Sequence, residues 1–183
     1  MEVLEAIRTR RSIRHYRPDP LPEEKINTIL EAARWAPSWG NTQCWRFVIV
    51  KDKERKALLA STLPSWNRAQ LAIKEAPVVI VACAQLGKSG FHEGKVVTNK
   101  GDWWYMFDVA LAMQSLTLAA HSLGLGTVHI GAFEAQEVAR LLAVPQGVAV
   151  VEMVLLGYPA EKGKMPSRKE LPDLVFYESY GQR

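Results

Sequence analysis

The sequence predicts a mixed α+β layer fold, in which helices pack around one sheet of about four strands. Three observations lead to this prediction. The chain has 183 residues, which is the usual size of a single domain. Hydrophobic residues make up 48% of it, so the chain can bury a core. Segments with helical spacing of apolar residues alternate irregularly with short runs of β-branched and aromatic residues.

Each expected helix rests on apolar residues three or four positions apart. One pattern is well marked, because Pro22 and two glutamates begin it and Ile26 and Ile29 share one face. The longest pattern ends before Gly124, which suits the residue just beyond a helix C-terminus. The expected helices cover residues 2–9, 21–36, 53–61, 66–76, 103–122 and 134–144.

Four apolar segments predict the strands, and a segment without periodicity separates two of them. The strands are expected at residues 45–52, 77–85, 127–133 and 148–159. Residues 86–102 are polar, contain glycines and exceed the usual length of a connection in a small domain. We therefore expect one domain over residues 1–183, with a lid or insertion at about residues 86–102.

The segment RTRRSIRHYR, residues 8–17, holds five of the chain's twelve arginines. A cation at a helix C-terminus is stabilised by the helix dipole, which accounts for one or two of them. The other arginines repel one another, and an anion bound among them would offset that repulsion. Arginine offers a fork of donors that matches phosphate or carboxylate, and Ser12 adds a hydroxyl. The segment predicts either an anion site or a solvated basic surface.

A second basic segment, EKGKMPSRKE, lies in the aperiodic tail. Its cations, Lys162, Lys164, Arg168 and Lys169, suit a solvated loop when taken alone. Together with the first segment they can complete a phosphate clamp. A nucleic-acid surface would need basic residues spread along one face, whereas the chain between these segments is apolar and typical of a core.

The stretch GLGTVHIG lacks the spacing of a dinucleotide fingerprint, which opens a helix after a strand. These glycines close a helix and precede a strand, so Gly124 and Gly126 are expected to form a helix cap and a tight turn. Gly131 follows a short strand, where a missing side chain lets a flat ligand approach the backbone.

Several chemistries have no motif in this sequence. The four histidines lack metal-ligand spacing, and no HExxH, P-loop or GxSxG motif is present. An enzyme of this kind would depend on a bound cofactor.

Cys44 and Cys83 have apolar neighbours, which suits buried thiols in a reducing cytoplasm. The first ten residues suit an amphipathic helix rather than a signal peptide, and polar residues interrupt the longest apolar run, so no membrane span is expected.

Four segments together resemble the nitroreductase family, in the family's order and over nearly the whole chain. They are RRSIRHYRPDPLPEEKINTILEAARWAPSWGNTQCWRFVIV, APVVIVACA, DVALAMQSLTLAAHSLGLGTVHIGAF and LLGYPAEKGKMPSRKELPDLVFY. The resemblance implies a three-layer α/β/α sandwich with a central mixed, mostly antiparallel sheet. It also implies an FMN-dependent oxidoreductase that forms a homodimer with FMN at the subunit interface. NADH or NADPH would reduce the flavin and leave, and a small acceptor such as a nitroaromatic or a quinone would then enter.

The resemblance also assigns residues to the cofactor. The phosphate and ribityl chain are expected at Arg10, Arg11, Ser12, Arg14 and, from the tail, Arg168. The loop that the partner subunit lays over the cofactor is expected at Pro37, Ser38, Trp39 and Asn41. The flavin ring is expected to meet Asn67, Gln70, Ile130, Gly131 and Ala132.

Some of these residues have simpler interpretations, and some depart from the family. Asn67 suits a helix N-cap, and Gln70 suits an exposed helix position. Cys44 stands where the family often has proline, and Trp39 stands where it often has a small residue. Trp39, Trp103 and Trp104 are candidate substrate contacts, although a tryptophan can equally anchor the long helix in the core.

The resemblance names no catalytic acid or base and no metal site. Two other functions stay open at this stage. One is different flavin chemistry within the family, either reductive dehalogenation or fragmentation of the flavin. The other is a flavin-binding protein without turnover.

Overall fold

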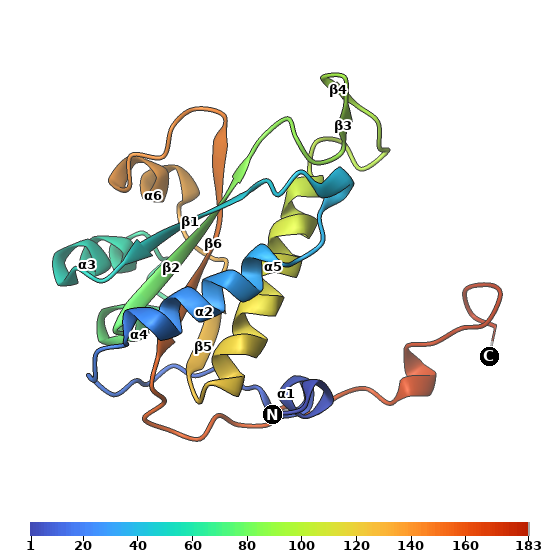
Figure 1. Cartoon of the computed structure of the whole chain (residues 1–183). Coiled ribbons are helices and arrows are strands. Elements are labelled where there is room, and N and C mark those ends of the chain that lie inside the picture. The colour runs from blue at the N-terminus through green and yellow to red at the C-terminus, as the bar shows by residue number, and fades with distance from the viewer. Residues whose placement is uncertain (183) are drawn as a thin grey trace.

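A four-stranded sheet forms the middle layer of the computed structural model, which describes residues 1–182 (Figure 1). Its strands lie in the order β1-β2-β6-β5, and each pairing between them is antiparallel. An isolated parallel bridge joins Ser12 to Thr127 at the outer edge of β5. The named strands are thus more uniformly antiparallel than expected. Their bounds are Trp45–Val50 (β1), Val78–Gln85 (β2), Gly126–Ile130 (β5) and Val148–Gly157 (β6).

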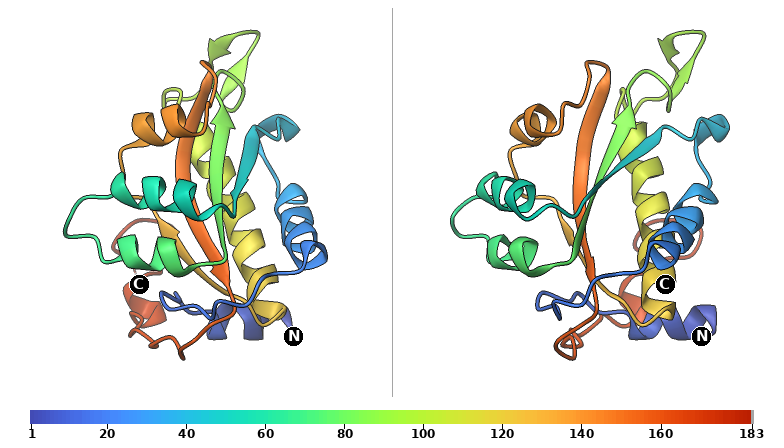
Figure 2. Two further views of the ribbon diagram at one scale, coloured as in Figure 1. Left: turned by 90° about the vertical axis from the view of Figure 1, so that its left-hand side faces the viewer. Right: turned by 60° about the vertical axis from the view of Figure 1, so that its left-hand side comes forward.

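Helices cover both faces of this sheet, which makes the three layers (Figure 2). In β2, Ile80 and Ala82 pack towards α2 and α5, whereas Val79 and Val81 pack towards α3, α4 and α6. A strand buried on both faces reads as a continuous apolar run rather than as an alternating one. The helices are Glu23–Arg34 (α2) and Trp104–Ser122 (α5) on one face, and Lys53–Ser61 (α3), Ala69–Glu75 (α4) and Ala135–Leu141 (α6) on the other.

The end of α5 forms the cap expected from the sequence. Gly124 has φ of +76°, and its N–H donates to the carbonyl of His121 while the N–H of Leu125 donates to that of Ala120. This is the Schellman arrangement, which favours glycine at the left-handed position. The expected turn at Gly126 is wrong, because Gly126 begins β5. A Cβ on Gly126 would lie 2.8 Å from the side chain of Ile13, so glycine here permits a close approach between two segments.

The connection over residues 86–102 contains a small hairpin, which its sequence did not predict. Its strands are Phe91–His92 (β3) and Lys95–Val96 (β4), and they project beyond the N-terminal end of α5 (Figure 1). Short 3-10 turns lie at Trp39–Asn41 (η1) and Leu171–Asp173 (η2).

The N-terminal end of the chain lies near the C-terminal end of α5 (Figure 1). Helix α1 (Val3–Thr9) packs there, and the tail after residue 160 passes α1 and then leads away from the layers (Figure 1). None of the helices in residues 1–182 is long and apolar enough to cross a membrane.

Candidate functional site: a basic cleft beside the edge of the sheet

The arginine-rich segment and the basic tail line one cleft of about 930 Å³. The chain has thus brought together two basic segments that are about 150 residues apart in sequence. Helix α4 and the turn before it supply the third wall. The lining residues are Arg10, Arg11, Ser12, Arg14, His15, Arg68, Leu71, Ala72, Glu161, Lys162, Gly163, Lys164, Met165, Pro166 and Arg168.

Backbone hydrogen bonds join the first basic segment to β5 and to the start of the tail. The N–H of Ile13 donates to the carbonyl of Thr127 at 2.9 Å, and the N–H of Ala160 donates to the carbonyl of His15 at 3.0 Å. The tail also packs closely against the first segment, because a Cβ on Gly163 would lie 2.4 Å from Cβ of Arg11. That separation is impossible for two side chains, so a glycine is needed where the tail crosses the arginines.

The side chain of Arg10 is partly buried in the cleft. Its Nη1 is buried and has no hydrogen-bond partner within the described chain. Burial, and then repulsion from Arg11 and Arg168, lowers the pKa of Arg10. Nη1 of Arg11, in contrast, donates to the carbonyls of Arg8 and Arg10, both at 2.7 Å. An anion between Arg10, Arg11 and Arg168 would supply the missing acceptor and relieve the repulsion.

The positive charge of these arginines also acts on His121, in the last turn of α5. Nε2 of His121 lies 2.8 Å from the hydroxyl of Thr9 on α1. Burial lowers the pKa of His121, and repulsion from Arg10 and Arg11 lowers it further. The imidazole therefore reports on the charge in the cleft.

Asn67 connects α4 to the end of β5. Its side-chain amide donates to the carbonyl of Ala132 at 3.3 Å, and its Oδ1 accepts from the N–H of Ala69 at 3.0 Å. The second contact is a local turn before α4, whose N-cap is Arg68, so Asn67 is not the N-cap that the simpler interpretation gave. The amide of Gln70 donates to the carbonyls of Leu63 and Pro64, at 3.0 and 3.2 Å. Gln70 therefore ties the preceding turn to α4 within one chain.

Gly131 and its neighbours form the strand end predicted to meet a flat ligand. No atom lies within 4 Å of the position that a Cβ on Gly131 would take. Ile130 is buried in the core, and the carbonyl of Ala132 is bonded to Asn67. The end of β5 is thus held by the hydrogen bond from Asn67, and the space beside Gly131 is free for a ligand.

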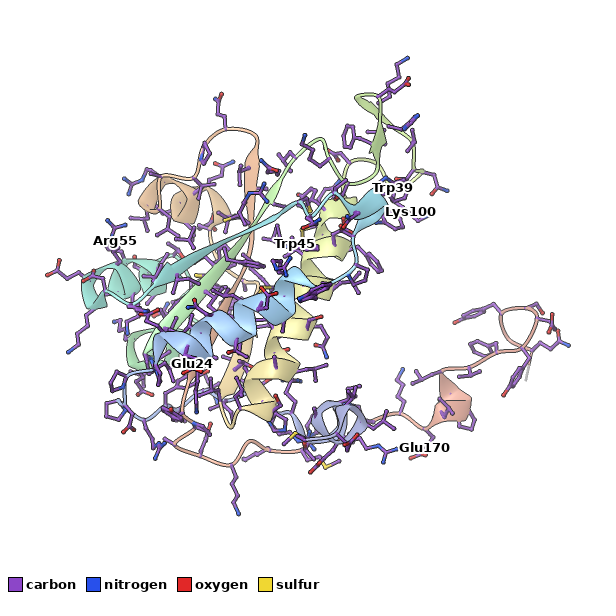
Figure 3. The ribbon with its side chains drawn as sticks, in the orientation of Figure 1. Glu24, Trp39, Trp45, Arg55, Lys100 and Glu170 are labelled. Atoms are coloured by element: carbon purple, nitrogen blue, oxygen red, sulfur yellow. The ribbon has the colours of Figure 1, made fainter. Side chains whose placement is uncertain are left out.

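The loop with Pro37, Ser38, Trp39 and Asn41 lies elsewhere. Figure 3 shows Trp39 near Lys100 at one end of α5, whereas Glu170 lies on the tail beyond α1. None of the four loop residues lines the basic cleft. One chain therefore does not bring this loop to the arginines.

Aromatic rings gather at that end of α5. The rings of Trp39 and Trp104 meet edge to face with centroids 5.0 Å apart, and Phe107 lies 5.4 Å from Trp104. Trp103 is 66% exposed. The three candidate substrate contacts thus divide into a packed pair and one exposed tryptophan.

A buried carboxylate fixes the loop, and the sequence analysis did not find it. Asp108 on α5 is 1% exposed and accepts from the N–H of Trp39, at 3.1 and 3.2 Å to its two oxygens. The hydroxyl of Ser89 donates to the same carboxylate at 2.5 Å and lies 3.0 Å from the hydroxyl of Thr42. The one available signal was a lone acid inside an apolar helical pattern.

Cys44 lies beside this network and is fully buried. Burial raises the pKa of its thiol, which disfavours the reactive thiolate. Within residues 1–182, no group of three or more histidine, cysteine or acidic side chains is placed to hold a metal ion.

Comparison with known proteins identifies the family. The model of the nitroreductase family matches residues 7–158. The chain belongs to this family. A Methanothermobacter thermautotrophicus protein with the names NADH dehydrogenase and NAD(P)H nitroreductase is 35% identical, over 98% of this chain and 88% of that protein. The FMN reductase [NAD(P)H] of Bacillus subtilis is 32% identical, over 98% of this chain and 74% of that protein.

A solved structure extends the comparison to the fold. The FMN-dependent nitroreductase of Clostridium difficile R20291 has a TM-score of 0.79 and 27% identity, over 97% of this chain and 99% of that one. These comparisons confirm the nitroreductase resemblance, the α+β fold and the class of enzyme, an NAD(P)H-dependent oxidoreductase.

Proposed function

We propose that this nitroreductase-family protein uses FMN and NAD(P)H to reduce small acceptors such as nitroaromatics or quinones. The donor and the acceptor would bind alternately at one site. The observation that carries this proposal is the buried, unpartnered Nη1 of Arg10 in a cleft lined by further cations. The donor set fits a phosphomonoester, and relatives over nearly the full chain have FMN in their names.

Each part of the cofactor has candidate residues in the proposal. The guanidinium groups of Arg10, Arg11, Arg14 and Arg168 and the hydroxyl of Ser12 would hold the phosphate and the ribityl chain. Asn67, Gln70 and the segment from Ile130 to Ala132 would border the ring. When bound, FMN supplies two-electron transfer, which no side chain of this protein offers. The protein would orient donor and acceptor and exclude water from their contact.

We further propose that two copies of the chain form the site. α5 is apolar around its circumference, which is typical of a helix buried on all sides, yet Phe107 is 56% exposed. Val3 and Leu4 on α1 and Tyr177 in the tail are also largely exposed. A second copy packed on α5 would cover such surfaces and can bring its Trp39 loop to the first copy's cleft. The protein would act in the cytoplasm.

The experiment that tests this function is a visible spectrum of the purified protein, followed anaerobically as NADPH and then NADH are added. Yellow protein that bleaches supports an FMN reductase. Protein that stays yellow indicates flavin binding without turnover. Colourless protein after incubation with FMN refutes the proposal. Product analysis after addition of an acceptor separates its reduction from dehalogenation or flavin fragmentation.

Two alanine variants test the phosphate site directly. Arg14→Ala and Arg168→Ala should each weaken FMN binding by about 10- to 150-fold, because a hydrogen bond to a charged group contributes about 1.5–3 kcal/mol. Flavin retention after dialysis measures the effect. Arg17→Ala is a matched control, because the guanidinium of Arg17 pairs with Asp19 at 3.4 Å and lies outside the cleft. Unchanged flavin content in both cleft variants would place the phosphate elsewhere.

A further inference from the structure

A histidine–carboxylate pair lies at the edge of the sheet and outside the basic cleft. Nδ1 of His129 on β5 and Oε2 of Glu152 on β6 are 2.7 Å apart. The side chain of His129 is 38% exposed and that of Glu152 is 16% exposed. The carboxylate holds one ring nitrogen, while Nε2 has no partner within residues 1–182. A carboxylate in this position orients an imidazole.

The pair lies on the face of the sheet where Gly131 is open. β5 is an edge strand, and Val128 and Ile130 pack into the core under α3, α4 and α6. Because side chains alternate along a strand, His129 lies on the opposite face, as does Val154, its partner on β6, which packs with residues of α2 and α5. Gly131 is the next residue in that alternation, and its Cβ position has no atom within 4 Å. A flat ligand against Gly131 would therefore lie beside the imidazole.

The arginine segment borders the outer edge of β5, where Ser12 bridges Thr127, and the other elements around His129 carry few charges. β5 and β6 carry no further ionisable side chain. α5 packs on this face; its ionisable side chains are Tyr105 and Asp108 in the first turns and His121 in the last turn. Glu152 is therefore the ionisable group that faces His129 from these elements.

We propose that His129, oriented by Glu152, donates the proton that accompanies acceptor reduction. This inference rests on the proposed function. Reduction of a quinone balances as NAD(P)H + H⁺ + quinone → NAD(P)⁺ + hydroquinone. The hydride supplies two electrons and one proton. The second proton passes from Nε2 of the imidazolium to a quinone oxygen, so an N–H bond breaks and an O–H bond forms. Water then reprotonates the neutral imidazole at its exposed side.

Two acceptors distinguish this role from simple stabilisation of the sheet edge. A soluble benzoquinone takes up protons on reduction, whereas ferricyanide takes one electron and no proton. His129→Gln should lower steady-state turnover with the quinone by roughly 100-fold, the lower end of general acid catalysis, and leave turnover with ferricyanide unchanged. Glu152→Gln should lower quinone turnover less, because it keeps the imidazole.

His92→Gln is the matched control. Its imidazole lies in the β3–β4 hairpin, 4.0 Å from Glu93, with a side chain that is 78% exposed. This variant should leave both turnover rates and their ratio unchanged.

Nuclear magnetic resonance gives a readout that is independent of activity. Addition of FMN to the unmodified protein should shift the imidazole C–H resonances of His129 and leave those of His92 in place. An unmoved His129 with FMN bound would overturn the inference, and so would an equal loss of both turnover rates or an unchanged ratio in His129→Gln. FMN that fails to bind the unmodified protein would overturn the proposed function itself, and this inference with it.

Discussion

Replacing Arg10 with methionine should stabilise the flavin-free protein and weaken its affinity for FMN. Methionine has a similar reach but no charge. In the flavin-free protein, Arg10→Met removes a buried nitrogen without a partner and ends the repulsion from Arg11 and Arg168. A buried, unsatisfied polar group costs about 1–3 kcal/mol, so the free energy of unfolding should rise by up to that amount. The same substitution removes a charged hydrogen bond to the phosphate, which predicts about 10- to 150-fold weaker FMN binding.

Two measurements on the same preparation check these opposite signs. Urea denaturation of the flavin-free protein gives the change in unfolding free energy. Quenching of FMN fluorescence gives the dissociation constant. Arg17→Met serves as the control from the same segment and should change neither quantity by a comparable amount. A loss of stability without FMN, or an unchanged affinity for FMN, would refute the assignment of Arg10 to an anion site.

Four further predictions concern the cleft and the lid. The pKa of His121 is lowered in the folded protein, so the unfolded chain binds its proton more readily. The stability from this group is therefore present above the pKa of the unfolded chain and is lost as pH falls through the pKa of the folded protein. His121→Gln should flatten the dependence of urea midpoints on pH below about 6.5. Inorganic phosphate should raise the pKa of His121 in a nuclear magnetic resonance titration, because it offsets the neighbouring positive charge. Gly163→Ala should weaken FMN binding, since the new Cβ would meet Arg11 at 2.4 Å and displace the tail, and flavin retention measures this. Replacement of Lys95 and Lys100 by alanine should raise the KM for NADPH at low salt, because cations in the segment of residues 86–102 would attract the anionic donor. An unchanged KM would contradict this electrostatic attraction.

The sequence predicted the elements well where one physical signal was sufficient. The apolar run of β2 and the helical stripe of α2 were both found, with ends that differ by a few residues. The helix cap at Gly124 followed from its position after an apolar helix. The hairpin at residues 91–96 was missed, because two-residue strands carry too little alternation to be recognised.

The candidate site was predicted mainly through the family resemblance. Charge density alone left the arginine segment open between an anion site and a solvated surface. Asp108 was missed because its role depends on the N–H of Trp39, 69 residues earlier in the chain. Gly126 was misassigned because its close contact is with Ile13, which its neighbours in sequence do not reveal.

By itself, the sequence determined most of the helices and the four strands of the main sheet, and it showed that positive charge gathers in two segments of the chain. Both are local properties, set by the spacing of apolar residues and by composition. Only the tertiary structure decided that the two basic segments share a cleft, that Nη1 of Arg10 is buried there without a partner, and that His129 faces Glu152. Burial, repulsion and hydrogen bonding depend on distances in space, and folding sets those distances between residues far apart in the chain.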